Sequence, residues 1–111
     1  MTRANIHITL SDGTKIKCVA DSSSAPEQGY IVEELILPLL SLNNGDEELK
    51  MLKEHCTMGE QRINADYRYL IDLKAKLVSL FEEHYFYKTG KFIKGPDITD
   101  RYDKYLIMLK S

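Results

Sequence analysis

The chain has 111 residues, of which 43% are hydrophobic and 29% are charged, and its formal net charge is −2. That length suits one domain with its own core, and the composition is too apolar for an intrinsically disordered chain. Residues 21–66 carry three bases and ten acids, and this acidic middle argues against a protein that coats nucleic acid over its whole surface. Residues 67–111 nevertheless carry nine bases and six acids, a net of +3 that leaves room for one basic face.

Segments that would direct the chain to a membrane or a secretory pathway are not recognised. The longest apolar-rich stretch, residues 30–42, contains Glu33, Glu34 and Pro38 and is too short and too polar to span a bilayer. No positively charged stretch followed by an apolar run opens the chain, so we expect no signal peptide. The two cysteines, Cys18 and Cys56, are far apart in sequence, and we expect free thiols in a reducing cytoplasm.

The first predicted element is a β-hairpin within residues 5–21. Apolar and polar residues alternate on both sides of Asp12-Gly13, which is the period of a strand followed by a turn. A three-residue loop over residues 11–13 pairs Ile8 with Ile16 and gathers the apolar side chains on one face. This register sends a mostly polar set to the other face: His7, Thr9, Lys15 and Lys17.

Two helices are predicted next. Ser24 and Glu27 have capping-box spacing, and the apolar residues of 31–42 form a broad helical face that Pro38 should kink or end near Leu37. A strand over residues 30–37 is the minor alternative. A short helix follows Asn43-Asn44-Gly45 and ends near Cys56.

The longest predicted element is a helix over residues 60–88. Its apolar residues recur at three- and four-residue steps, and Gly90 is placed at its C-cap. Asp97 or Thr99 then caps a last helix that runs to about Leu109.

The predicted fold class is therefore α+β. We expect an N-terminal β-hairpin packed against about four helices, the longest near 60–88, in a single domain over residues 1–111.

Residue patterns for catalysis, metals or cofactors are not recognised. The three histidines, His7, His55 and His84, are scattered, and no zinc or di-iron spacing occurs. The three aspartates at 97, 100 and 103 are better explained by helix capping and solvation than by a hard-cation site. We therefore predict no catalytic residue, no metal site and no cofactor.

The segment His84–Gly95, "HYFYKTGKFIKG", mixes aromatic rings with lysines. It fits the end of the long helix followed by a return to the core. It also fits a surface that stacks bases and holds phosphates, or a patch that binds protein. The candidate interaction residues are Tyr85, Tyr87, Lys88, Lys91, Phe92 and Lys94, with two further tyrosines of the last helix, Tyr102 and Tyr105.

The sequence favours a small, non-enzymatic protein-interaction module: an adaptor, an inhibitor or an assembly subunit. Its partner would be another protein or a second copy of the chain, and no membrane contact is expected. The first alternative is a nucleic-acid-binding protein that uses the aromatic and lysine residues of 85–94. The second alternative is an enzyme of unknown class.

Overall fold

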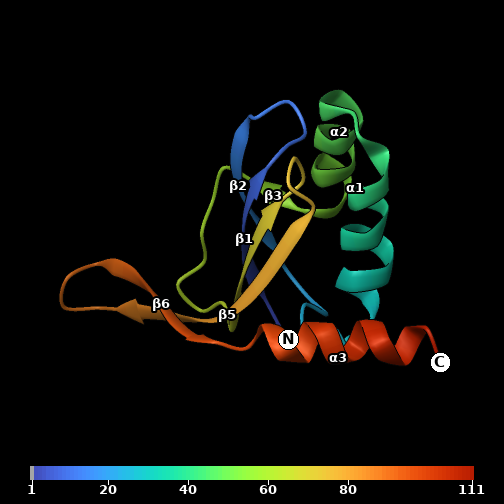
Figure 1. Ribbon diagram of the computed structural model, residues 1–111. Coiled ribbons are helices and arrows are strands. Elements are labelled where there is room, and N and C mark those ends of the chain that lie inside the picture. Colours follow the sequence, from blue (N-terminus) through green and yellow to red (C-terminus); the bar gives the residue numbers. More distant parts are fainter. Residues whose placement is uncertain (1) are drawn as a thin grey trace.

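The computed structural model describes residues 2–111 and places six strands in one mixed sheet (Figure 1). The strand order across the sheet is β3-β2-β1-β4-β5-β6. The central pair, β1 and β4, is parallel, and every other neighbouring pair is antiparallel. The strands are β1 (Ala4–Thr9), β2 (Lys15–Ala20), β3 (Thr57–Met58), β4 (Tyr67–Asp72), β5 (Leu77–Phe86) and β6 (Lys91–Asp97).

Residues 2–111 contain three α-helices, so the expectation of about four is wrong, although strands and helices do combine in an α+β arrangement. They are α1 (Leu37–Leu42), α2 (Gly45–His55) and α3 (Thr99–Leu109). A 3-10 turn, Pro26–Gln28, and a π-helical segment, Ile31–Ile36, precede α1.

The predicted hairpin register is confirmed. Ile8 lies opposite Ile16, and Ile6 lies opposite Cys18. Gly13 has φ of +91°, the left-handed conformation that the loop requires and that glycine adopts without a steric penalty. The apolar residues of both strands therefore share one face.

The predicted helix over residues 60–88 is wrong, because this segment forms β4, a tight turn and β5. Tyr69 and Ile71 are buried and point into the core, whereas Arg68, Leu70 and Asp72 alternate with them on the other face, as strand residues do. The turn between the strands has no glycine or proline, and Lys76 takes the left-handed conformation there with φ of +59°. Gly90, expected at a helix C-cap, lies instead in the turn between β5 and β6.

The helical elements of residues 31–55 cover one face of the sheet (right in Figure 1) and bury the hydrophobic core against it. Pro38 stands near the start of α1, where the π-helical segment gives way to an α-helix. The predicted short helix is confirmed as α2, and Asn44 caps it by accepting a hydrogen bond from the Glu47 amide at 3.1 Å. The largest fully buried apolar side chains include Ile6, Leu10, Ile31, Leu35, Ile36, Leu39, Leu52, Tyr69, Leu73 and Leu80.

The predicted last helix is confirmed as α3, which packs across β5 and the 3-10 turn. The Leu80 amide donates a hydrogen bond to Thr99 Oγ1 at 2.9 Å, and the Arg101 guanidinium forms an ion pair with Glu27 at 2.6 Å. The hairpin of β5 and β6 extends beyond the body of the molecule (left in Figure 1). Within residues 2–111, no helix is both long enough and apolar enough to cross a membrane.

Candidate functional site

The candidate site is the sheet face opposite the helices, which we call the open face. The strand register assigns its members, because residues directly opposite one another on paired strands point to the same side. His7 lies opposite both Lys17 and Leu70, and Leu70 lies opposite Ser79. The open face comprises His7, Thr9, Lys15, Lys17, Arg68, Leu70, Asp72, Leu77, Ser79 and Phe81.

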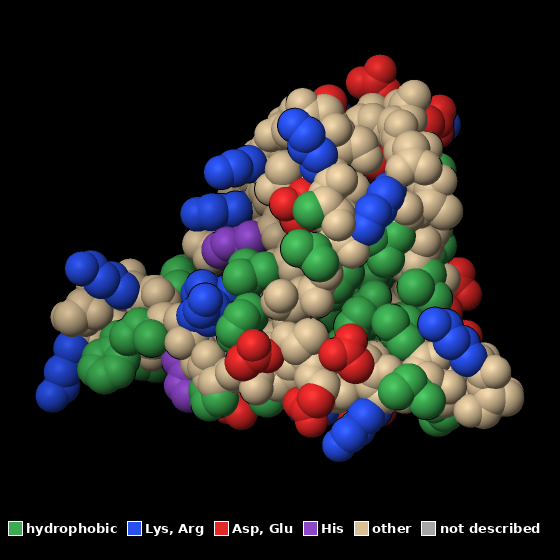
Figure 2. Space-filling view, in the orientation of Figure 1, with side chains coloured by type: hydrophobic (Ala, Val, Ile, Leu, Met, Phe, Trp, Pro, Cys, Tyr) green, Lys and Arg blue, Asp and Glu red, His purple; other side chains and the backbone are tan. Residues whose placement is uncertain are grey.

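A pocket of about 600 Å³ lies on the open face over β2, β1, β4 and β5. Lys15 and Lys17 stand on its β2 side, whereas Leu70 and Leu77 stand on its β4 and β5 side. Leu77 is 64% exposed, a high value for a leucine on a sheet. Figure 2 shows lysine and arginine side chains and a histidine gathered on the side of the molecule away from the helices. The pocket therefore has a cationic wall and an apolar wall.

His7 occupies the middle of this surface. Burial lowers the pKa of its imidazole below the usual value of 6.5, and the charges of Arg68 and Lys17 lower it further. Gln61, on the loop between β3 and β4, lies with Nε2 at 2.9 Å from His7 Nε2. At neutral pH, His7 therefore presents a neutral ring, and the positive charge of the pocket comes from Lys15 and Lys17.

The loop between β3 and β4 covers the lower part of the same sheet face and leaves the upper part open (Figure 1). Asn5, which is buried, holds this loop: its Oδ1 accepts from the Arg62 amide at 2.7 Å, and its Nδ2 donates to the Arg62 carbonyl at 3.1 Å. The same Nδ2 donates to Glu83 Oε2 at 2.9 Å. Arg68 completes the group with two hydrogen bonds to Glu83, at 3.0 and 2.7 Å. This polar network therefore holds the loop against the sheet beside the pocket.

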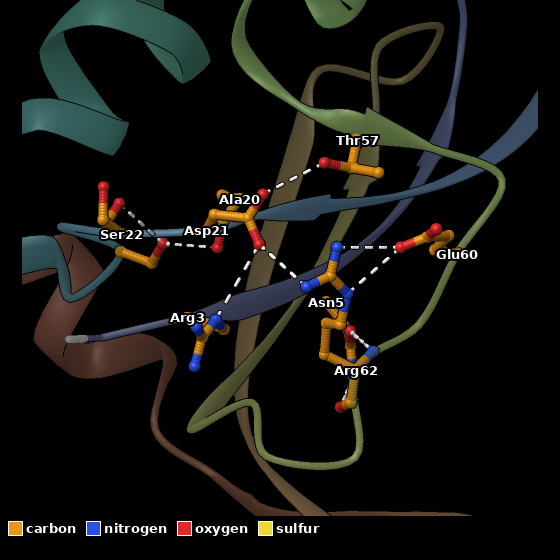
Figure 3. Close-up of polar contacts among 9 residues, drawn as sticks. Arg3, Asn5, Ala20, Asp21, Ser22, Thr57, Glu60 and Arg62 are labelled. Atoms are coloured by element: carbon orange, nitrogen blue, oxygen red, sulfur yellow. Dashed lines mark hydrogen bonds and ion pairs between the residues drawn. The ribbon is translucent and has the colours of Figure 1, made fainter.

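Figure 3 shows a second network that anchors the same loop at the end of β2. Asp21 accepts a hydrogen bond from Thr57 Oγ1 at 3.0 Å and pairs with Arg62 at 3.2 Å. Arg3 approaches the same carboxylate at 3.8 Å, and Glu60 pairs with Arg62 at 2.9 Å. The two arginines and the two carboxylates neutralise one another. We therefore interpret this cluster as an anchor for the loop and not as a binding site.

The hairpin end over residues 84–94, which we call the arm, carries most of the candidate interaction residues. Tyr85 packs edge-on against Phe92, with ring centroids 4.9 Å apart, and against Tyr87 at 5.1 Å. Tyr87 is 77% exposed. The rings are therefore engaged with one another through their edges, as neighbouring aromatic side chains often are.

The three lysines of the arm do not share one side. Lys94 lies over the Phe81 ring at 4.5 Å, on the open-face side. Lys91, three positions earlier on β6, lies opposite Phe86 and points to the other side of the hairpin. Lys88 lies in the turn. The arm therefore does not present a single row of lysines beside the rings.

The two remaining candidate residues, Tyr102 and Tyr105, are buried against the core on α3. Burial raises the pKa of Tyr102 to about 12. Tyr105 Oη donates a hydrogen bond to Glu33 Oε2 at 2.9 Å, which raises the pKa of Tyr105. The structure places both tyrosines between α3 and the body of the protein, away from the arm.

The lining of the pocket was not among the candidate residues read from the sequence. The hairpin register already places His7, Thr9, Lys15 and Lys17 on the face away from the core, and this was the available signal. Leu70 and Leu77 could not be added to them, because a helix over 60–88 would have put both in the core. No group of three metal-ligating side chains is found in the part of the chain that the structure describes.

No family model, curated protein or solved structure compared with this chain matches it.

Proposed function

We propose that the protein is a small interaction module that docks a partner protein on its open face. The observation that carries the proposal is the apolar wall of the pocket, formed by the half-buried Leu70 and the exposed Leu77, on a sheet whose opposite face is filled with helices. Apolar residues that stand together on an otherwise polar surface often mark a protein-interaction site. The arm, which extends from the same sheet, adds exposed aromatic area beside this surface.

Nucleic-acid binding is the weaker candidate. Its main support in the sequence was the row of lysines beside aromatic rings at residues 84–95. Lys91 and Lys94 point to opposite sides of the hairpin, and Lys88 lies in the turn, so the three lysines do not form one cationic row beside the rings. Proteins that bind single strands combine aromatic stacking with a continuous cationic groove.

Site-specific photo-crosslinking in a native lysate tests the proposal. A photoreactive phenylalanine analogue replaces Leu77 on the open face or, as the control, Lys53 on the exposed side of α2. We expect a protein adduct at position 77 that resists nuclease, and no corresponding adduct at position 53. Equal labelling at the two positions, or an adduct that nuclease removes, would contradict the proposal.

A further inference from the structure

The open face is asymmetric, because the two walls of its pocket differ in charge. Lys15 and Lys17 are exposed and form no ion pair with any residue of the 2–111 range. The facing wall is apolar and carries Asp72, whose Oδ1 accepts a hydrogen bond from the Ala75 amide at 3.0 Å. An acidic group on a partner would be attracted to the β2 side and repelled from the Asp72 end.

The floor of the pocket favours one kind of secondary structure in the partner. Its central strands, β1 and β4, are hydrogen-bonded to neighbours on both sides. An extended segment laid on them would bury amide and carbonyl groups without partners, whereas a helix satisfies these groups internally. Four strands span about 14 Å at their usual spacing, and a helix with its side chains is about 10 Å wide.

We propose that the open face binds an amphipathic helix of a partner protein, with an apolar stripe against Leu70 and Leu77 and an acidic flank toward Lys15 and Lys17. This inference rests on the proposed function and names the partner's structure and charge. The helix would complete a third layer, so that both faces of the sheet would be covered.

The test uses three synthetic peptides of about 18 residues, long enough for a stable stapled helix. The first has leucines at helical spacing and glutamates on one flank. The second carries lysines in place of the glutamates. The third is an unstapled version of the first in which two central residues are replaced by proline. Binding to the full chain is followed by fluorescence anisotropy at low salt.

We expect the acidic helix to bind about tenfold more tightly than the lysine version, because two exposed ion pairs are gained and two repulsions avoided. The proline-containing peptide should bind at least as weakly as the lysine version. The double variant Lys15→Glu/Lys17→Glu should reverse the charge preference. The matched control Lys50→Glu/Lys53→Glu, on the exposed side of α2, should leave the preference unchanged. All four positions are exposed, and circular dichroism checks that each variant is folded.

Several results would overturn the inference. These are the absence of a preference for the acidic helix, equal binding of the proline-containing peptide, and tighter binding of a single-stranded oligonucleotide in competition. A dimer in sedimentation that Leu77→Asp abolishes would assign the face to a second copy of the chain. If crosslinking at position 77 captures a protein while the peptides show no preference, the inference fails and the proposed function stands. If position 77 captures no protein, the proposed function itself fails.

Discussion

Arg68 donates two hydrogen bonds to Glu83 across adjacent strands, from Nε to Oε2 at 3.0 Å and from Nη2 to Oε1 at 2.7 Å. The Glu83 side chain is fully buried, and its Oε2 also accepts from Asn5 at 2.9 Å. Three strands of the sheet, β1, β4 and β5, are thereby joined by one carboxylate. This contact fixes the lower boundary of the open face.

Glu83→Ala should therefore destabilise the protein strongly. Removing one partner of a buried ion pair leaves the other charge without compensation, which typically costs about 3–5 kcal/mol. Urea denaturation measures the change in the free energy of unfolding. Glu82→Ala, at the neighbouring exposed position, is the control and should cost much less. Similar losses for the two variants would show that the buried pair is not a major source of stability.

A second buried carboxylate joins the N-terminal hairpin to α2. Glu48 is fully buried, and it accepts hydrogen bonds from the Ser11 amide, at 2.9 Å, and from the Ser11 hydroxyl. Glu48→Ala should lower the free energy of unfolding by about 2–3 kcal/mol, because the Ser11 amide loses a charged acceptor. Glu47→Ala lies in the same helical turn but is exposed, so it should change stability by less than about 0.5 kcal/mol. Denaturant titrations measure the free energy of unfolding of both variants. They decide whether the buried contact with Ser11, or merely the loss of a carboxylate in this turn of α2, accounts for the change.

The hairpin could be derived from the sequence because two independent signals agree there. The alternation of apolar residues sets the faces, and Gly13 supplies the turn conformation, so only one register keeps Ile6, Ile8 and Ile16 together. The same register placed Lys15 and Lys17 on the open face. Part of the candidate site was therefore contained in the sequence.

Residues 60–88 could not be derived in the same way. Their apolar residues fit helical steps and strand alternation alike, and short apolar runs do not separate the two. The turn between β4 and β5 lacks a glycine signal because Lys76 takes the left-handed conformation. Lys76 is held there by tertiary contacts: its Nζ donates to the Leu40 carbonyl at 2.7 Å and to Asn43 Oδ1. No local sequence pattern reports such a contact.

His7 predicts a dependence of stability on pH. Because its pKa is below 6.5 in the folded state, the unfolded chain binds more protons there as the solution becomes acidic. The His7 contribution should be fully present above about pH 6.5 and should be lost as the pH falls through 6.5 toward the folded pKa. His7→Gln should remove this component, so its unfolding free energy should fall less between pH 7 and pH 5 than that of the wild type. Parallel pH profiles for the two proteins would contradict the assignment.

The two thiols should differ in reactivity. Cys18 is fully buried, and both its hydrogen bond to Cys56 and its burial raise its pKa. Cys56 is partly exposed, and the same hydrogen bond lowers its pKa. Iodoacetamide should therefore modify Cys56 first in the native protein, since the thiolate is the reactive form, and Cys18 only after denaturant is added. Peptide mass mapping after timed labelling measures both rates. Modification of Cys18 at the rate of Cys56 would contradict the prediction.

Two glycines with positive φ allow backbone strain to be separated from steric conflict. At Gly13, φ is +91° and an added Cβ would meet no atom within 4 Å. At Gly29, φ is +86° and an added Cβ would lie 2.7 Å from Tyr105 Oη and 2.8 Å from Glu33 Oε2. Gly13→Ala should cost about 1 kcal/mol from strain alone, whereas Gly29→Ala should cost about 2–4 kcal/mol from strain and displacement of α3.

A double-mutant cycle identifies the source of the extra cost at position 29. Tyr105→Phe removes the hydroxyl that the new methyl group would meet, so Gly29→Ala should cost less in that background than in the wild type. The cost of Gly13→Ala should be the same in both backgrounds, because Gly13 has no contact with α3. An unchanged cost of Gly29→Ala would mean that the Tyr105 hydroxyl is not its source and that backbone strain and the contact with Glu33 account for it. A reduced cost would instead show that α3 packs against Gly29, in the short link between the 3-10 turn and the π-helical segment.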